Sequence, residues 1–244
     1  MPEDKTWRIK KTQRESDDVT SVYLESPDPD RFRQRRPGQF ATIRIMGERG
    51  WSEPHPFTIS CSPEDEDLRL TIKRAGDFTR TIHGIAPGAE VQFQGPYGAF
   101  LKDIDEQEEI VFIAGGVGIT PFLSALRHFR NIDADNRVTL FWANKSLDDA
   151  FGRAELEEMT RHIDLRVIHV LSREDPPGHS EAEGKVRFEK GHVTRDILKR
   201  HTISPTASFY LCGPPRMQEF VLEELEHCGV DKQKVQREGF NYGK

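Results

Sequence analysis

The first hundred residues carry short runs in which apolar and polar positions alternate, separated by turns rich in glycine and proline. Alternation with a period of two is typical of half-buried strands. The pattern predicts strands at residues 7–11, 19–24, 40–45, 56–61, 68–73 and 91–94, and one short helix at 78–83. Several short strands joined by such turns favour a small antiparallel Greek-key β-barrel, which we place over residues 1–102.

After this segment the pattern changes to apolar runs that alternate with segments of helical spacing, which favours a doubly wound parallel-sheet α/β domain. We place this domain over residues 103–244, with an acidic connector at 103–107 as the boundary and an exposed loop at 175–184. Strands are predicted at 109–114, 138–143, 165–171 and 208–211. Helices are predicted at 121–130, 153–160, 194–200 and 215–228.

The stretch from Ile110 to Leu126 reads as a buried strand, a glycine turn and a helix. Gly115, Gly116 and Gly118 allow a sharp turn and a close approach of a ligand to the backbone, and Thr120 and Pro121 suit a helix start. Free N–H groups there favour a phosphate site. The spacing G-x-G-x-x-P differs from the common dinucleotide pattern, and the acidic residue expected about 20 residues later is missing. Taken alone, the stretch also fits a tight strand-to-helix turn without a ligand.

Composition narrows the class of protein. The chain has 244 residues, a net charge of −6 and no apolar run of membrane-spanning length, so neither a transmembrane segment nor a signal peptide is expected. Its cysteines are few and odd in number, which predicts a protein of the reducing cytoplasm. The negative charge disfavours a nucleic-acid partner. Three cysteines and nine histidines show no metal-ligand spacing, so no metal is assigned. Any redox chemistry is therefore expected to use an organic cofactor.

Two stretches in the first half could bind such a cofactor. In His55-Pro-Phe-Thr58, an aromatic ring beside a hydroxyl could hold a flat heteroaromatic ring, although Phe57 could equally be a core residue. In Lys73-Arg-Ala-Gly-Asp-Phe-Thr79, a glycine and a hydroxyl precede a short helix, and such a turn can bind phosphate or simply cap the helix.

Seven short motifs in this order resemble the ferredoxin–NADP reductase superfamily, and most closely the FAD/NAD(P)H dehydrogenase module of ferric reductases and NADPH oxidases. The motifs are Pro37-Gly-Gln-Phe40, His55-Pro-Phe-Thr58, Gly76-Asp-Phe-Thr79, Gly95-Pro-Tyr-Gly98, Ala114-Gly-Gly-Val-Gly-Ile-Thr-Pro121, Cys212-Gly-Pro-Pro215 and Glu238-Gly-Phe240. They cover nearly the whole chain.

The resemblance implies an FAD site on the barrel. Phe57 would lie against the isoalloxazine ring, and Thr58 would form a hydrogen bond near its N5 atom. His55 stands where most of the superfamily carries an arginine that pairs with the pyrophosphate, so a strong charge contact is not expected there. Two-phosphate binding favours FAD over FMN. The implied FAD-binding residues are His55, Pro56, Phe57, Thr58, Thr71, Ile72, Lys73, Gly76, Asp77, Phe78 and Thr79.

The resemblance also implies a nicotinamide cofactor on the second domain. Its pyrophosphate would lie on Gly115, Gly116, Gly118, Thr120 and Pro121, and its nicotinamide beside Cys212, Gly213 and Pro214. Phe240 would cover the flavin, with Tyr242 as a rival, and the catalytic residues are taken as Thr58, Cys212 and Phe240. No neighbour in the sequence activates Cys212 as a nucleophile.

The choice between NADH and NADPH stays open. Ser172 and Arg173, with Lys185 beyond the loop, resemble a group that holds the 2′-phosphate of NADPH, and charge is the physical reason. Acids at 148–149 stand where NADH-specific relatives carry one, and an acid there repels that phosphate.

We therefore predict a flavin-dependent NAD(P)H:acceptor oxidoreductase that passes single electrons to a haem protein, a ferredoxin or a ferric chelate. The chain carries no iron–sulfur or haem domain, so the acceptor is expected to be a separate molecule, with a membrane redox partner among the candidates. One alternative is a non-catalytic flavin-binding regulatory or assembly subunit, supported by His55. Another is a dehydrogenase of small substrates, for which no acid–base pair is evident.

Overall fold

The structure is a computed structural model that describes residues 7–48, 50–177 and 184–239. It divides into two compact units. The first comprises Met1–Lys102 with Thr120–Asn131, and the second comprises Asp103–Ile119 with Ile132–Lys244. The two-domain division at residue 102 stays a prediction, because one helix beyond it groups with the first unit.

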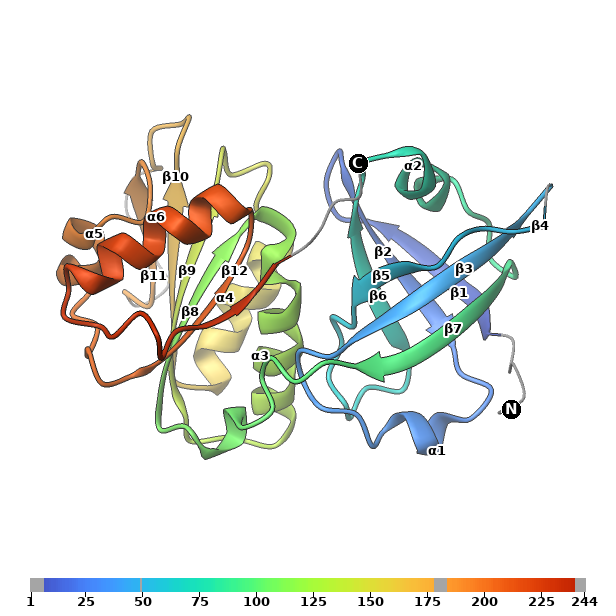
Figure 1. The fold of residues 1–244 in the computed structure, drawn as a ribbon, viewed down its shortest axis with the longest axis horizontal. Coiled ribbons are helices and arrows are strands. Elements are labelled where there is room, and N and C mark those ends of the chain that lie inside the picture. The colour runs from blue at the N-terminus through green and yellow to red at the C-terminus, as the bar shows by residue number, and fades with distance from the viewer. Residues whose placement is uncertain (1–6, 49, 178–183, 240–244) are drawn as a thin grey trace. The chain divides into compact units, whose positions relative to one another are not determined.

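The first unit contains seven strands in one antiparallel sheet, shown in blue to green in Figure 1. The strand order is β4-β3-β7-β1-β2-β6, and β5 pairs with the other side of β3. An antiparallel bridge between Ile59 and Leu70 joins the segment after β5 to β6, so the sheet closes on itself. The predicted antiparallel barrel is therefore confirmed. The strands are β1 (Trp7–Arg14), β2 (Val19–Glu25), β3 (Phe40–Gly47), β4 (Gly50–Trp51), β5 (His55–Thr58), β6 (Leu68–Lys73) and β7 (Glu90–Tyr97).

Alternation along these strands fills the barrel. Ile43 on β3 and Leu24 on β2 are almost fully buried, as the period of two requires. At one end, the rings of Trp7 and Phe93 stack with centroids 4.4 Å apart, and Phe32 meets Trp7 edge-on at 5.0 Å. Phe32 ends a short helix, α1 (Pro29–Phe32), inside the segment 28–38, where no helix was predicted. The helix predicted at 78–83 is α2 (Asp77–His83).

Strand β7 runs three residues beyond its predicted end, through Gly95 and Pro96 to Tyr97. The register with β3 shifts between Phe40 and Thr42, which is the signature of a β-bulge. A Cβ on Gly95 would lie 3.1 Å from the Cβ of Ala41, and the φ angle of Gly95 is +147°. Glycine and proline therefore do not end this strand, because the bulge accommodates both of them.

The second unit is a parallel sheet of six strands in the order β11-β10-β9-β8-β12-β13, which confirms the predicted α/β architecture. Neither β11 nor β13 was predicted. The strands are β8 (Glu109–Gly115), β9 (Arg137–Asn144), β10 (Leu165–Leu171), β11 (Val186–Lys190), β12 (Ser208–Cys212) and β13 (Gln236–Glu238). The helices are α3 (Thr120–Asn131), α4 (Arg153–His162), α5 (Arg195–Arg200) and α6 (Pro215–Glu226), with 3₁₀ helices at Ile104–Glu106 and Gly116–Ile119.

Helices α5 and α6 cover one face of this sheet (Figure 1). Ile197 of α5 and Val221 of α6 belong to the same buried cluster as Ile113, Phe141 and Ile168 of the central strands. These strands are apolar almost throughout, as parallel strands buried on both faces are. Among the described residues, none of the helices is long and apolar enough to cross a membrane.

Helix α3 groups with the barrel because its polar side chains bond to the segment after β5. The Ser124 hydroxyl donates to the Cys61 carbonyl at 2.7 Å, and the Arg127 guanidinium donates to the Ser60 carbonyl. His128 Nδ1 lies 2.9 Å from Glu64 Oε1. The helix predicted to follow a phosphate-binding turn is thus fixed to barrel residues by buried hydrogen bonds.

Candidate functional site

The order of the parallel strands creates a switch point between β8 and β12. The chain leaves β8 towards β9 on one side, whereas β12 lies on the other. In open α/β sheets, ligands bind outside the carboxyl ends of the strands at such a point. Here β8 ends at Gly115 and β12 ends at Cys212, and Ala114 pairs with Cys212. Two motifs almost a hundred residues apart in sequence are therefore adjacent.

Glycine is required where these two chain segments meet. A Cβ on Gly118 would lie 2.8 Å from the Cys212 carbonyl carbon and 3.0 Å from Gly213 Cα, both of which are backbone atoms. A Cβ on Gly213 would lie 3.0 Å from the Gly115 amide nitrogen. Pro214 follows at the N-cap of α6. The structure thus brings together Gly115, Gly118, Cys212, Gly213 and Pro214.

Gly116 differs from these glycines because open space surrounds it. Its φ angle is +53°, and a Cβ would have no neighbour within 4 Å. Its carbonyl accepts a hydrogen bond from Trp142 Nε1 at 2.9 Å, which fixes the turn. Helix α3 starts at Thr120, with Pro121 in its first turn. The open space at Gly116, the first residue of the 3₁₀ helix Gly116–Ile119, fits an anionic group.

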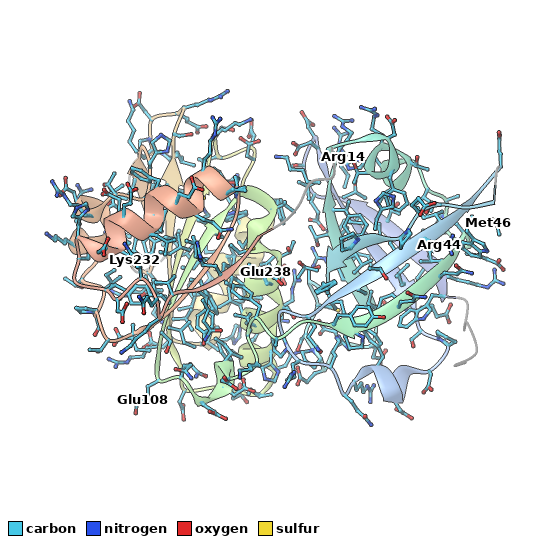
Figure 2. All side chains as sticks on the ribbon, viewed as in Figure 1. Arg14, Arg44, Met46, Glu108, Lys232 and Glu238 are labelled. Atoms are coloured by element: carbon cyan, nitrogen blue, oxygen red, sulfur yellow. The ribbon has the colours of Figure 1, made fainter. Side chains whose placement is uncertain are left out.

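Cys212 lies beside a buried carboxylate that the sequence reading left without a role. Glu238 pairs with Cys212 in register, and Figure 2 marks it on β13. Burial raises the pKa of Glu238 to about 7, and within the described part of the chain its buried Oε2 has no hydrogen-bond partner. Burial, and secondarily the Glu238 charge, raise the pKa of the Cys212 thiol. Cys212 therefore stays a neutral thiol at physiological pH, in agreement with its exclusion as a nucleophile.

Three aromatic rings gather on the barrel from the two predicted flavin motifs. His55 and Phe78 stack with ring centroids 3.7 Å apart, and Phe57 lies nearly parallel to Phe78 at 6.0 Å. Burial lowers the pKa of His55, so the ring is neutral at physiological pH. His55 therefore contributes a flat apolar face and no fixed positive charge.

The Thr58 hydroxyl is buried and finds no hydrogen-bond partner among the residues that the structure describes. Such a group is costly unless a ligand or water pairs with it. By contrast, the Thr71 hydroxyl lies 2.9 Å from both the Ser21 and Ser60 hydroxyls, so its hydrogen bonds stay inside the barrel. On the same strand, Ile72 is buried and Lys73 Nζ pairs with Asp18 at 3.0 Å. Pro56 of β5 is exposed.

At the start of α2, the side chain of Thr79 forms hydrogen bonds with the backbone of the preceding turn. The Thr79 hydroxyl accepts from the amides of Ala75 and Gly76 at 2.8 and 2.9 Å and donates to the Gly76 carbonyl. The Asp77 carboxylate pairs with Arg80. Gly76 itself has open space around it. Any phosphate here would therefore meet the amide groups of the first turn and not the Thr79 hydroxyl.

Ser172 and Arg173 lie at the carboxyl edge of the sheet, directly after β10. Their amides donate to the carbonyls of Asn144 and Lys145 at 3.0 and 2.9 Å. Among the described residues, the exposed Arg173 guanidinium has no carboxylate partner.

The grouping of Lys185 with Ser172 and Arg173 is wrong. Lys185 precedes β11, whose Val186 pairs with Val167, so it lies towards the amino end of the sheet and donates to the Thr160 carbonyl at 2.8 Å. The lysine at the carboxyl edge is Lys190, which pairs with Leu171 in register and with Asp175 by charge. Because strand β11 was not predicted, Lys185 was expected at the carboxyl edge of the sheet, whereas it lies towards the amino end.

Of the two acidic residues after β9, Asp148 and Asp149, one accepts hydrogen bonds from a neighbouring residue. The Asp149 carboxylate accepts from the Ser146 amide and hydroxyl at 3.2 and 3.1 Å, whereas Asp148 is exposed. Phe240 and Tyr242 lie outside the described residues.

Sequence families match both halves of the chain. An FAD-binding domain family matches residues 6–101, and an oxidoreductase NAD-binding domain family matches residues 112–223. Because each match falls on one of the two motif sets described above, the families support FAD on the barrel and a nicotinamide cofactor on the parallel sheet.

Curated relatives cover most of the chain. A flavohemoprotein of Bacillus subtilis (strain 168) is 27% identical over 97% of this chain and 59% of its own length. The reductase component of a Rhodococcus jostii propane 2-monooxygenase is 29% identical over 93% of this chain and 61% of its own length. The gamma subunit of sulfhydrogenase 2 from Pyrococcus furiosus is 31% identical over 82% of this chain and 70% of its own length. The chain thus spans about three fifths of the first two relatives.

Solved structures share the fold. The FAD/NAD-binding domain of nitric oxide dioxygenase from Vibrio cholerae has a TM-score of 0.81, with 23% identity over 96% of this chain and 98% of that domain. A ferredoxin NADP+ reductase from Neisseria gonorrhoeae, with bound FAD and NADP, has a TM-score of 0.77, with 16% identity over 97% of both chains. The closer placement beside ferric reductases and NADPH oxidases stays a prediction. On the two domain families and the sulfhydrogenase relative, the chain belongs to the ferredoxin–NADP reductase superfamily.

Proposed function

We propose that this chain is a flavin-dependent NAD(P)H:acceptor oxidoreductase that delivers single electrons to a separate acceptor, which is a haem protein, a ferredoxin or a ferric chelate. The observation that carries the proposal is the meeting of Gly115–Gly118 with Cys212–Gly213 at the switch point of the parallel sheet. Relatives named as a flavohemoprotein and as a monooxygenase reductase component support redox work with a haem or an oxygenase.

The barrel residues fit FAD. The unpartnered Thr58 hydroxyl, the parallel rings of Phe57, Phe78 and His55, and the open space at Gly76 offer a hydrogen bond, flat faces and room for phosphate. When bound, FAD supplies a two-electron acceptor that can release electrons one at a time. The chain binds it with few fixed charges, because His55 is neutral.

On the second unit, the chain's task is to position the nicotinamide cofactor. Hydride transfer needs donor and acceptor atoms near contact distance, and positioning supplies much of the rate. The 3₁₀ helix at Gly116–Ile119 binds the pyrophosphate through backbone amides, and the neutral Cys212 thiol gives the nicotinamide a small, uncharged neighbour.

We expect NADPH as well as NADH to serve as donor, because among the described residues Arg173 has no carboxylate partner, while Asp149 is engaged by Ser146. Arg173→Gln should raise KM for NADPH about tenfold and leave KM for NADH within about twofold, since one lost charge-assisted contact costs roughly 1.4 kcal/mol. Steady-state rates with both donors measure this. Arg161→Gln, an exposed arginine on α4, is the matched control. A strong preference of the unmodified protein for NADH would remove the role of Arg173.

The function is tested by turnover with ferricyanide as an artificial one-electron acceptor. The FAD-loaded protein is expected to oxidise NADH or NADPH with two ferricyanide ions reduced per donor. Protein that cannot bind flavin would contradict the proposal. Protein that holds FAD but oxidises neither donor would support the non-catalytic subunit instead.

A further inference from the structure

A cavity lies on the outer edge of the parallel-sheet unit, away from the switch point. Its volume is about 580 Å³, and it is lined by residues of β10, the edge strand β11 and the end of α5. Figure 1 labels these three elements. Arg166, near the start of β10, lines it. Six residues separate Arg166 from Ser172 along an extended chain, which amounts to roughly 20 Å. The cavity therefore reaches towards the amino end of the sheet, whereas the cofactor residues lie at the carboxyl end.

The lining is strongly basic. Among the described residues, Arg166, Lys185, Arg187 and Arg200 line the cavity together with one carboxylate, that of Glu189. Glu189 is engaged already, because it pairs with Arg200 and lies 2.9 Å from His201 Nε2. The described lining residues therefore carry more cations than carboxylates, in a chain whose net charge is −6. The cavity is thus lined by positive charge although the whole chain is negatively charged.

Among the described residues, the remaining cations bond only to neutral oxygen atoms of the protein. Arg166 donates to Thr139 Oγ1 at 2.9 Å and to the His201 carbonyl at 3.4 Å. Arg187 donates to the Gly184 carbonyl at 2.9 Å, and Lys185 donates to the Thr160 carbonyl at 2.8 Å. These bonds hold the side chains in place without neutralising them. Within the described part of the chain, Glu189 is the only carboxylate that lines the cavity.

The floor of the cavity on the α5 face is apolar. Ile168 is 1% exposed and belongs to the buried cluster beneath α5. Arg187 pairs with Ile168 in register, so both side chains lie on the α5 face of the sheet. An apolar floor below fixed cations is the usual construction of a small-molecule site, and the volume lies in the usual range.

We propose that this cavity binds a phosphate-bearing small molecule with two to three negative charges. Guanidinium groups present planar pairs of donors that match phosphate oxygens, and the excess of cations over carboxylates among the described lining residues suits a di- or trianion better than a single carboxylate. The site does not use the glycine turn or the flavin residues, so it stands apart from the proposed oxidoreductase function.

The test is calorimetric titration of the FAD-loaded protein with inorganic pyrophosphate and, separately, with ADP. The Gly116→Asp background is used to suppress phosphate binding at the glycine turn. Arg187→Gln should weaken binding of both probes about tenfold, and the control Arg161→Gln should leave it unchanged. Glu189→Gln should strengthen binding, because it removes the one negative charge; damage to the fold would instead weaken it.

Tighter binding of ADP than of pyrophosphate would show that the apolar floor accepts an organic body. Equal binding would mark inorganic polyphosphate as the ligand. The proposal is overturned if neither probe binds, or if Arg187→Gln and Arg161→Gln have the same effect.

Discussion

Replacing Gly116 by aspartate is expected to weaken NAD(P)H binding about 100-fold and to leave FAD binding unchanged. Gly116 lies in open space at a φ angle of +53°, where the only non-glycine residues tolerated at low cost are asparagine and aspartate. A carboxylate there would face the pyrophosphate, and two like charges about 6 Å apart at a protein surface repel by about 2.8 kcal/mol, which is about 100-fold in affinity. Titration of NADP+ or NAD+ into the FAD-loaded variant measures the effect.

Gly116→Asn is the matched control, because asparagine has the same shape and backbone tolerance as aspartate without its charge. It should weaken binding by less than tenfold. Equal losses for aspartate and asparagine would mean that steric or backbone effects dominate and that no phosphate lies at Gly116. Loss of FAD from both variants would show that the turn serves the fold and not the nicotinamide cofactor.

Glu238→Gln is expected to stabilise the protein at pH 8 by up to about 3 kcal/mol, and by much less at pH 5. The folded pKa of Glu238 is about 7 because the carboxyl is buried, whereas the ordinary value is 4.5. The folded state therefore holds a proton that the unfolded chain has already lost, and stability falls as the pH rises from 4.5 to 7. Each pKa unit corresponds to about 1.4 kcal/mol.

Urea unfolding of both proteins at pH 5 and pH 8 gives the comparison. Exposed Glu219→Gln on α6 serves as the control for loss of one negative charge. A stability difference between Glu238→Gln and the unmodified protein that is the same at both pH values would contradict a raised pKa. If the unmodified protein were more stable than Glu238→Gln at pH 8, the pKa of Glu238 would be lowered and not raised, which would imply a cationic partner for its carboxylate.

The sequence predicts the strands that carry strong apolar periodicity and misses those that do not. Leu165–Leu171 and Leu68–Lys73 have the predicted bounds, because apolar residues dominate or alternate along them. Strand β11 presents Arg187 and Glu189 on one face at the edge of the sheet, and β13 has only polar residues. These two exist through pairing with β10 and β12, which is tertiary information that a local pattern does not contain.

The candidate site divides in the same way. The glycines and Cys212 could be found from the sequence, since a strand end followed by glycine or proline has a local signature. The misplacement of Lys185 followed directly from missing β11. The raised pKa of Glu238 could not be predicted from the sequence, because it comes from burial of the carboxyl beside Cys212. The local bonds of Thr79 likewise depend on the turn at Ala75 and Gly76.

The proposed function requires hydride transfer from NAD(P)H to FAD bound to this chain. The most direct measurement is anaerobic mixing of the FAD-loaded protein with one equivalent of NADH or NADPH, followed by the visible absorbance of the flavin. We expect this absorbance to be lost with at least one donor, and to be lost much more slowly in Gly116→Asp than in Gly116→Asn at the same donor concentration. Flavin that stays oxidised with both donors would contradict the proposed function.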